Sequence, residues 1–297
     1  MNQASARRSV WCAGPIGLHR LSYLEWGERS NPQVVLCVHG LTRNACDFDV
    51  LAGALCGDYR VIAPDLPGRG ESDWLPDPKQ YVVPMYLADM VTLIARLDAE
   101  AVHWVGTSLG GLVGMALAAL PNAPVRSMVL NDVGPVLGAA AITRIASFAG
   151  KGHDFDSVDA AVQYMRTVAA PFGPHSDPQW RSLTEPMLRP RPGGGWRLHY
   201  DPAIAASFPA EAQESDITLW PLYDAIRCPT LLLRGAVSDL LSSQTVEEMR
   251  QRGPTLEVVE FAGVGHAPTL MHEDQVGAVR EFLRRHRDRA LTAPSRR

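Results

Sequence analysis

The sequence predicts an α/β fold, in which a mostly parallel β-sheet is flanked by helices. Three observations support this prediction: short apolar runs rich in β-branched residues recur along the chain, amphipathic segments separate them, and one long central segment interrupts the alternation. A chain of 297 residues is near the upper limit for a single hydrophobic core. We therefore expect one large domain that carries an insertion.

The expected strands are spaced so that helices fit between most of them. Residues 18–27 alternate apolar and polar side chains, which predicts early antiparallel strands. The later runs are continuously apolar, as in parallel strands that are buried on both faces. These runs are residues 34–40, 59–65, 102–108, 126–133, 229–235 and 256–263.

Two segments have the apolar periodicity of amphipathic helices. In residues 86–100, five apolar residues fall on one helical stripe: Leu87, Met90, Val91, Ile94 and Leu97. Residues 275–286 show the same pattern. Helices that alternate with buried strands predict a sheet covered on both faces.

The alternation stops at residues 135–221. This stretch contains helical fragments, many prolines and scattered aromatic residues, and no evident strand of the main sheet. Such an insertion is usually a cap over the strand ends, so we predict a helical cap here. The core is then residues 15–134 and 222–288, with residues 1–14 a flexible N-terminus and residues 289–297 a flexible basic tail.

Composition narrows the class of protein. A net charge of −4 gives no electrostatic footprint for nucleic acid. Five cysteines without metal-type spacing suit thiols in a reducing compartment. The sequence has no apolar stretch as long as a membrane span, and no apolar stretch follows the N-terminal arginines. We expect a cytoplasmic protein that binds neither nucleic acid nor membrane; its oligomeric state is left open.

Ser108 is the predicted nucleophile. It lies between Gly106 and Gly110, after a strand-like run and before an apolar segment rich in glycine and alanine. The three letters of G-x-S-x-G are weak evidence alone, but a sharp turn from strand to helix exposes the serine oxygen and points the helix N-terminus at it. The context therefore makes the motif specific.

A nucleophilic serine needs a base, and the base needs an orienting acid. His266 is the predicted base, because it lies late in the chain in a glycine-rich loop that follows a strand. Asp239 is the preferred acid, in the loop after residues 229–235, and Asp132 at the end of residues 126–133 is the alternative. All of these loops leave the carboxyl ends of predicted parallel strands, where open α/β sheets build their sites.

Further residues are candidates for binding. The backbone amides of Leu41 and Leu109 are predicted to form an oxyanion hole. Arg43 is a candidate for contact with a substrate carboxylate or carbonyl, and Trp220 is a candidate for the pocket wall. His39 is interpreted as structural.

These motifs resemble the α/β-hydrolase superfamily, and the likeness runs from about Leu18 to His286. The resemblance implies an eight-stranded sheet with the cap after the sixth strand, and acyl transfer to water with no metal and no organic cofactor. The matching positions are the nucleophile elbow Gly106-Thr107-Ser108-Leu109-Gly110, the oxyanion loop His39-Gly40-Leu41, the segment with Asp65, Gly68, Gly70 and Ser72, and the acid and histidine loops with Asp239 and His266.

The nucleophile type separates activities within this superfamily. Haloalkane dehalogenases and epoxide hydrolases use aspartate at the elbow, so Ser108 argues against both. The leading hypothesis is a carboxylesterase that cleaves small or medium acyl esters through an acyl-enzyme. The alternatives are a carbon–carbon bond hydrolase of ring-fission diketones, a lactonase or a perhydrolase, and a non-catalytic small-molecule receptor on the same fold.

Overall fold

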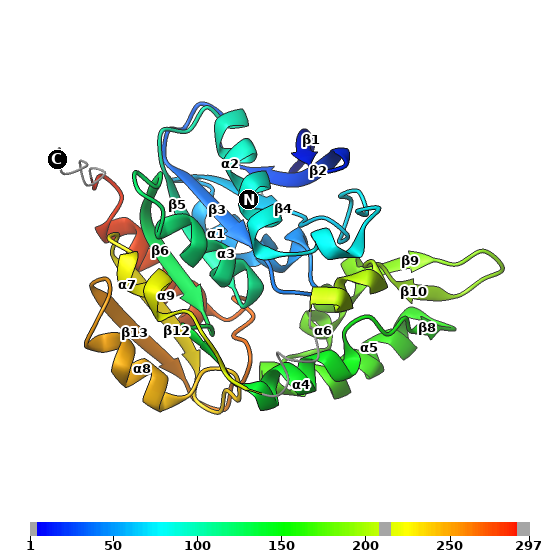
Figure 1. The fold of residues 1–297 in the computed structure, drawn as a ribbon. Coiled ribbons are helices and arrows are strands. Elements are labelled where there is room, and N and C mark those ends of the chain that lie inside the picture. Colours follow the sequence, from blue (N-terminus) through cyan, green and yellow to red (C-terminus); the bar gives the residue numbers. More distant parts are fainter. Residues whose placement is uncertain (1–4, 208–214, 290–297) are drawn as a thin grey trace.

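An eight-stranded β-sheet forms the centre of the molecule in the computed structural model, which describes residues 5–207 and 215–289 (Figure 1). The strand order is β1-β2-β4-β3-β5-β6-β12-β13. β2 pairs antiparallel with both of its neighbours, and every other pair in this sheet is parallel. The strands are β1 (Ala6–Gly14), β2 (Gly17–Trp26), β3 (Val34–Val38), β4 (Arg60–Pro64), β5 (Val102–Thr107), β6 (Val125–Asn131), β12 (Thr230–Gly235) and β13 (Leu256–Phe261).

The central strands are buried along their whole length, as the apolar runs predict. Every residue of β3, β4 and β12 is buried. A parallel sheet with both faces covered explains why these strands lack the alternation seen in residues 18–27. The predicted fold class, a mostly parallel eight-stranded sheet flanked by helices, is confirmed.

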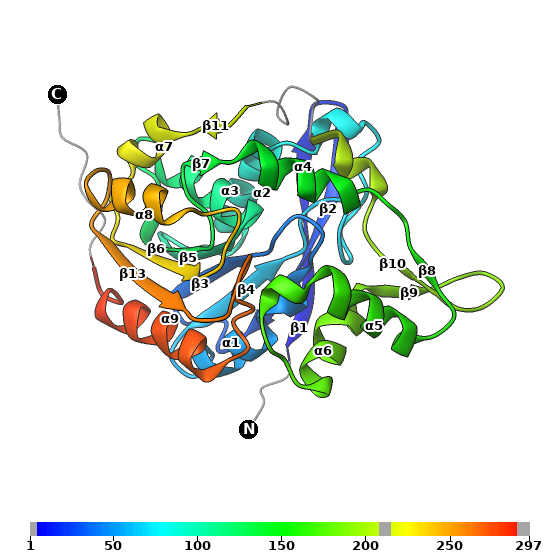
Figure 2. The ribbon, with the colours of Figure 1, turned by 90° about the horizontal axis from the view of Figure 1, so that it is seen from below.

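Helices cover both faces of the sheet (Figure 2). α2 (Val83–Arg96), α3 (Leu109–Ala118), α7 (Trp220–Ala225) and α8 (Ser243–Arg250) lie on one face, and α1 (Asp49–Leu55) and α9 (Glu273–Arg285) lie on the other. Each face has its own apolar cluster: Met90 and Leu93 of α2 pack into the first, and Val279 and Phe282 of α9 into the second. Both helices expected from periodicity are therefore present, and each faces the sheet with its apolar stripe.

Residues 135–221 contribute no strand to the main sheet within their described part; we call them the inserted segment. It follows β6, beside the main sheet (Figure 1), but it is not purely helical as predicted, because it also forms two small sheets, β8-β10-β9 and β11-β7. Before its last helix, α7, its elements are β7 (Val136–Leu137), α4 (Ala139–Phe148), β8 (Asp154–Phe155), α5 (Val158–Val168), η3 (Ala170–Phe172), α6 (Asp177–Thr184), η4 (Glu185–Met187), β9 (Leu188–Pro190), β10 (Trp196–Leu198), η5 (Pro202–Ser207) and β11 (Ile217–Thr218). Two further 3₁₀ helices lie in the core, η1 (Ala45–Phe48) and η2 (Pro78–Gln80).

The prediction that residues 1–14 are flexible is wrong for residues 6–14, which form β1 and pair with β2 over their whole length. Two arginines in this strand bind carboxylates that are distant in sequence: Arg7 Nη1 lies 2.7 Å from Asp65 Oδ2, and Arg8 pairs with Glu25. Both carboxylates are buried, so the pairing of the strand depends on tertiary partners that composition does not reveal. Residues 290–297 of the predicted basic tail lie outside the described residues.

The part of the chain that the structure describes contains no helix long and apolar enough to span a membrane. The five cysteines are free thiols.

Candidate active site

The turn from β5 to α3 holds Ser108 in a strained backbone conformation, with φ of 52° and ψ of −114°. Steric constraints explain why the motif has glycine at positions 106 and 110. A Cβ on Gly106 would lie 2.4 Å from the carbonyl oxygen of Gly110, and one on Gly110 would lie 2.0 Å from the carbonyl oxygen of Val38. No side chain fits at such distances, so the tight packing of β5, α3 and β3 requires glycine. Strain of this kind at a non-glycine residue is typical of functional sites.

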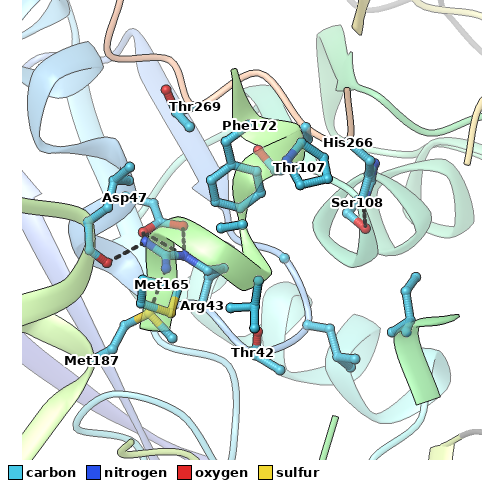
Figure 3. Close-up of a pocket in the computed structure, with 18 of the residues that line it drawn as sticks. Thr42, Arg43, Asp47, Thr107, Ser108, Met165, Phe172, Met187, His266 and Thr269 are labelled. Atoms are coloured by element: carbon cyan, nitrogen blue, oxygen red, sulfur yellow. Dashed lines mark hydrogen bonds and ion pairs between the residues drawn. The ribbon is translucent and has the colours of Figure 1, made fainter. Parts of the chain in front are cut away.

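His266 bridges Ser108 and Asp132. Its Nε2 lies 2.9 Å from Ser108 Oγ, as Figure 3 shows, and its Nδ1 lies 2.8 Å from Asp132 Oδ2. Asp132 is fully buried, and its other oxygen, Oδ1, accepts a hydrogen bond of 2.9 Å from the Gly235 amide. This geometry allows Nδ1 of the imidazole to donate to the carboxylate and Nε2 to accept from the serine hydroxyl.

The prediction that Asp239 is the partner of His266 is wrong. Asp239 forms a two-pronged ion pair with Arg144 of α4, at 2.5 and 3.0 Å, and its side chain is 46% exposed. The residue before it reaches the site instead, since Ser238 Oγ donates a hydrogen bond of 2.6 Å to Asp132 Oδ2. The residues that follow β6 and β12 are therefore in contact, and Asp132 is the aspartate that contacts the imidazole.

Two supporting residues were missed by sequence reasoning, Ser238 and Asn131. Asn131 Nδ2 donates to Thr107 Oγ1 at 3.0 Å and to the Pro268 carbonyl at 2.8 Å, so it links the serine turn to the histidine loop. The only signal for either residue in the sequence is its adjacency to a candidate acid, Asn131 before Asp132 and Ser238 before Asp239.

The predicted oxyanion loop lies against the serine turn. A Cβ on Gly40 would be 3.7 Å from Ser108 Cβ, and among the described residues neither the Leu41 amide nor the Leu109 amide donates a hydrogen bond. Leu109 is the first residue of α3, so its amide lies at the positive end of the helix dipole. Both amides are thus available to an anionic oxygen.

His39 is structural, as expected. Its Nδ1 donates to the Gly40 carbonyl at 2.7 Å, and its Nε2 accepts from the Leu66 amide at 2.9 Å. Burial lowers the pKa of His39 to about 4, so the ring is neutral near pH 7 and holds the loop by both nitrogens.

The segment that begins at Asp65 is also structural. The Asp65 carboxylate accepts hydrogen bonds from the Ala45 and Glu71 amides, at 2.8 and 3.0 Å. Gly70 has φ of 52°, and a Cβ there would lie within 2.5 Å of that carboxylate. The resemblance therefore marks a turn packed around a buried aspartate, which supports the loop that follows Leu41.

Arg43 lines the pocket, but its guanidinium is already engaged. Its Nε lies 2.8 Å from Asp47 Oδ2, its Nη2 donates to the Leu183 carbonyl at 2.8 Å, and its Nη1 contacts the sulfur of Met187 (Figure 3). Asn44 acts alongside it, since its Nδ2 donates to the Pro186 carbonyl at 3.0 Å. Two consecutive residues after the oxyanion loop therefore tether the inserted segment to the core.

An apolar cavity connects the core to the inserted segment and contains Ser108 and His266. The prediction that Trp220 lines it is wrong, because that ring packs edge-on against Tyr223 and under the guanidinium of Arg252 instead. The cavity includes Gly40, Leu41, Thr42, Arg43, Asp47, Phe48, Thr107 and Leu270 from the core and Arg144, Ile145, Phe148, Tyr164, Met165, Val168, Phe172, Leu183, Met187 and Leu198 from the inserted segment.

One group of described residues has metal-ligating donors close together: Cys12, His19 and Asp89, within 4.8 Å of one another. These residues belong to β1, β2 and α2, away from the serine turn. His19 Nε2 lies 3.1 Å from Asp89 Oδ2, while within the described residues the buried Asp89 Oδ1 accepts no hydrogen bond. We interpret the group as a buried hydrogen-bonded pair beside a thiol.

The comparisons with known proteins agree with the fold and the geometry. A family model described as "Alpha/beta hydrolase family" matches residues 35–281. The chain belongs to this family. It is 49% identical to the 3-hydroxybutyrate-oligomer hydrolase of Cupriavidus necator, over 92% of this chain and 96% of that protein.

Two other relatives match most of the chain at lower identity. An esterase of Mycobacterium tuberculosis is 30% identical over 89% of this chain and 85% of that protein. The crystal structure of an alpha/beta hydrolase from Novosphingobium aromaticivorans superimposes with a TM-score of 0.85 at 37% identity, covering 96% of this chain and 99% of that one. The protein is a hydrolase that acts on esters.

Proposed function

We propose that this α/β-hydrolase cleaves the ester bonds of 3-hydroxybutyrate oligomers, with Ser108, His266 and Asp132 as its catalytic triad. The observation that carries the proposal is the position of His266, in hydrogen-bond contact with both Ser108 and Asp132 at the wall of an apolar cavity. The near full-length similarity to the hydrolase of Cupriavidus necator supports the choice of substrate.

Acylation begins when Ser108 Oγ attacks the ester carbonyl carbon and His266 Nε2 takes the serine proton. Asp132 keeps the imidazole oriented and stabilises its charged form. The Leu41 and Leu109 amides receive the negative oxygen of the tetrahedral intermediate. The intermediate collapses, the alcohol leaves with the proton from His266, and the acyl group remains on Ser108.

Deacylation repeats these steps with water. His266 takes a proton from a water molecule, the resulting hydroxide attacks the acyl carbonyl, and Ser108 leaves with the proton. The released acid and alcohol together account for one ester bond and one water. The proposed steps use the named groups of this chain, the ester and one water molecule.

The cavity wall suits a hydroxyacyl chain. Each 3-hydroxybutyrate unit carries a methyl branch and an ester carbonyl, so its surface alternates apolar and weakly polar. The wall offers apolar side chains such as Met165 and Phe172 together with the hydroxyls of Thr42, Thr107 and Thr269 (Figure 3). A mainly apolar pocket with a few polar groups is the common pattern for small-molecule sites.

The direct test incubates the enzyme with the linear 3-hydroxybutyrate dimer and measures the released 3-hydroxybutyrate by chromatography. We expect turnover by the wild type and a fall in kcat by about 10⁴ to 10⁶ for Ser108→Ala. Ser9→Ala, at an exposed position of β1, is the matched control and should behave as wild type. Full activity of Ser108→Ala would overturn the nucleophile. If the wild type does not cleave the dimer but reacts with a fluorophosphonate at Ser108, the proposed substrate is wrong and the proposed nucleophile is supported.

A further inference from the structure

Two arginines line the cavity, and they differ in how readily they could bind a negatively charged substrate. Arg43 is 8% exposed, and its charge is neutralised by Asp47 in a two-pronged pair. A carboxylate that approached it would have to displace a buried partner, which is costly. Arg43 is therefore poorly suited to read a charged substrate.

Arg144 is the available cation. It projects from α4 into the cavity lining, with 36% of its side chain exposed, and its Nε and Nη2 bind the two oxygens of Asp239. Within the described residues, its Nη1 has no hydrogen-bond partner. Exposed ion pairs contribute about 0–1 kcal/mol to stability, so one carboxylate can replace another on Arg144 at little cost.

The position of this pair connects it to the triad. Asp239 directly follows Ser238, whose hydroxyl is hydrogen-bonded to Asp132. Arg144 and Ser108 line the same cavity. An anion held by Arg144 would thus be bound to a residue that lines the same cavity as the serine.

We propose that Arg144 is a specificity-determining residue that binds the terminal carboxylate of the substrate in place of Asp239. This inference rests on the proposed function, because a hydroxy-acid oligomer ends in a carboxylate. Cleavage of the last ester bond releases a hydroxy acid that carries this group. A guanidinium binds a carboxylate through two parallel hydrogen bonds, which fixes the orientation of the leaving group.

The test compares the 3-hydroxybutyrate dimer with its neutral primary amide, which keeps the same ester bond and lacks the charge. The wild type should prefer the acid in kcat/KM by at least about 10-fold. Arg144→Gln should bring the ratio of acid to amide close to one, mainly through a higher KM for the acid. Arg166→Gln is the matched control, because Arg166 pairs with Asp177 on the inserted segment and does not line the cavity.

The Asp239→Asn variant shows whether Arg144 acts by binding the substrate or by holding the Asp239 loop in place. It removes the competing carboxylate and keeps Arg144, so the KM for the acid should not rise. A rise equal to that of Arg144→Gln, or an Arg144→Gln variant that keeps the preference for the acid, would overturn the inference and leave the proposed function standing. A wild type that cleaves neither dimer would overturn the proposed function, and this inference with it.

Discussion

His266 Nδ1 lies 2.8 Å from Asp132 Oδ2, while the carboxylate of Asp239 is bound to Arg144 of α4. Two aspartates follow neighbouring strands of the sheet, β6 and β12, and only one of them contacts the imidazole. The buried Asp132 carboxylate also accepts hydrogen bonds from Ser238 and Gly235, which hold its orientation. This contact assigns the two aspartates different roles and gives the first prediction.

Asp132→Asn should lower kcat by about 10⁴, because an amide can hold the imidazole in the wrong tautomer. Asp239→Asn should lower kcat on a neutral nitrophenyl ester by less than about 10-fold, since it removes only an exposed ion pair. Steady-state kinetics of the two variants side by side give the ranking. The opposite ranking would mean that Asp239, and not Asp132, is the acid of the triad.

Ser238→Ala should reduce kcat by about 10-fold, which corresponds to about 1.4 kcal/mol, and leave KM nearly unchanged. The variant removes the hydrogen bond to Asp132 and the acceptor for the Leu240 and Leu241 amides. Ser238→Thr keeps the hydroxyl and should restore the rate. If Ser238→Ala changed KM alone, the residue would act on substrate binding and not on Asp132.

Gly110→Ala should destabilise the fold by about 2–4 kcal/mol, because its methyl group would lie 2.0 Å from the Val38 carbonyl oxygen. Gly277→Ala is the control: it lies within α9, and a methyl group there meets nothing within 4 Å. That variant should gain about 0.5–1 kcal/mol from its higher helix propensity. Urea unfolding measures both. Equal stabilities of the two variants would contradict the steric explanation of the elbow.

The free energy of unfolding should fall as the pH drops from about 6.5 toward 4, in part because of His39. Burial lowers the pKa of His39 to about 4 in the folded protein, below its ordinary value of 6.5. The unfolded chain therefore binds this proton first, and the stabilisation present above pH 6.5 is lost as the folded pKa is approached.

His39→Gln keeps an acceptor for the Leu66 amide and removes the titration. Urea unfolding at several pH values should give a shallower slope for this variant, by up to about 3 kcal/mol over the whole range. His103, whose pKa is also lowered to about 4 by burial, adds a parallel contribution that remains in the variant. An unchanged slope would mean that the pKa of His39 is the same in the folded and unfolded protein.

The sequence was sufficient for the features that depend on local sterics. Gly106 is explained within the motif, because a Cβ there would meet the Gly110 carbonyl, whereas Gly110 is needed because Val38 of β3 packs against it. His266 could be found because its loop follows a strand late in the chain. The acid could not be chosen, because Asp132 and Asp239 both follow parallel strands and only the tertiary arrangement decides which side chain meets the imidazole. β1 was missed for a similar reason, since its arginines pair with Asp65, far along the chain, and with Glu25 of the neighbouring strand β2.

The tether formed by Arg43 and Asn44 has a consequence for changes in substrate range. Only Thr42 separates these residues from Leu41, and they contact Leu183, Pro186 and Met187 of the inserted segment. We therefore expect a redesign of α6 or η4 for a bulkier acyl chain to shift the loop whose Leu41 amide is the proposed donor to the reacting oxygen. Variants of α6 or η4 that accept a wider range of acyl chains should therefore also have a lower kcat.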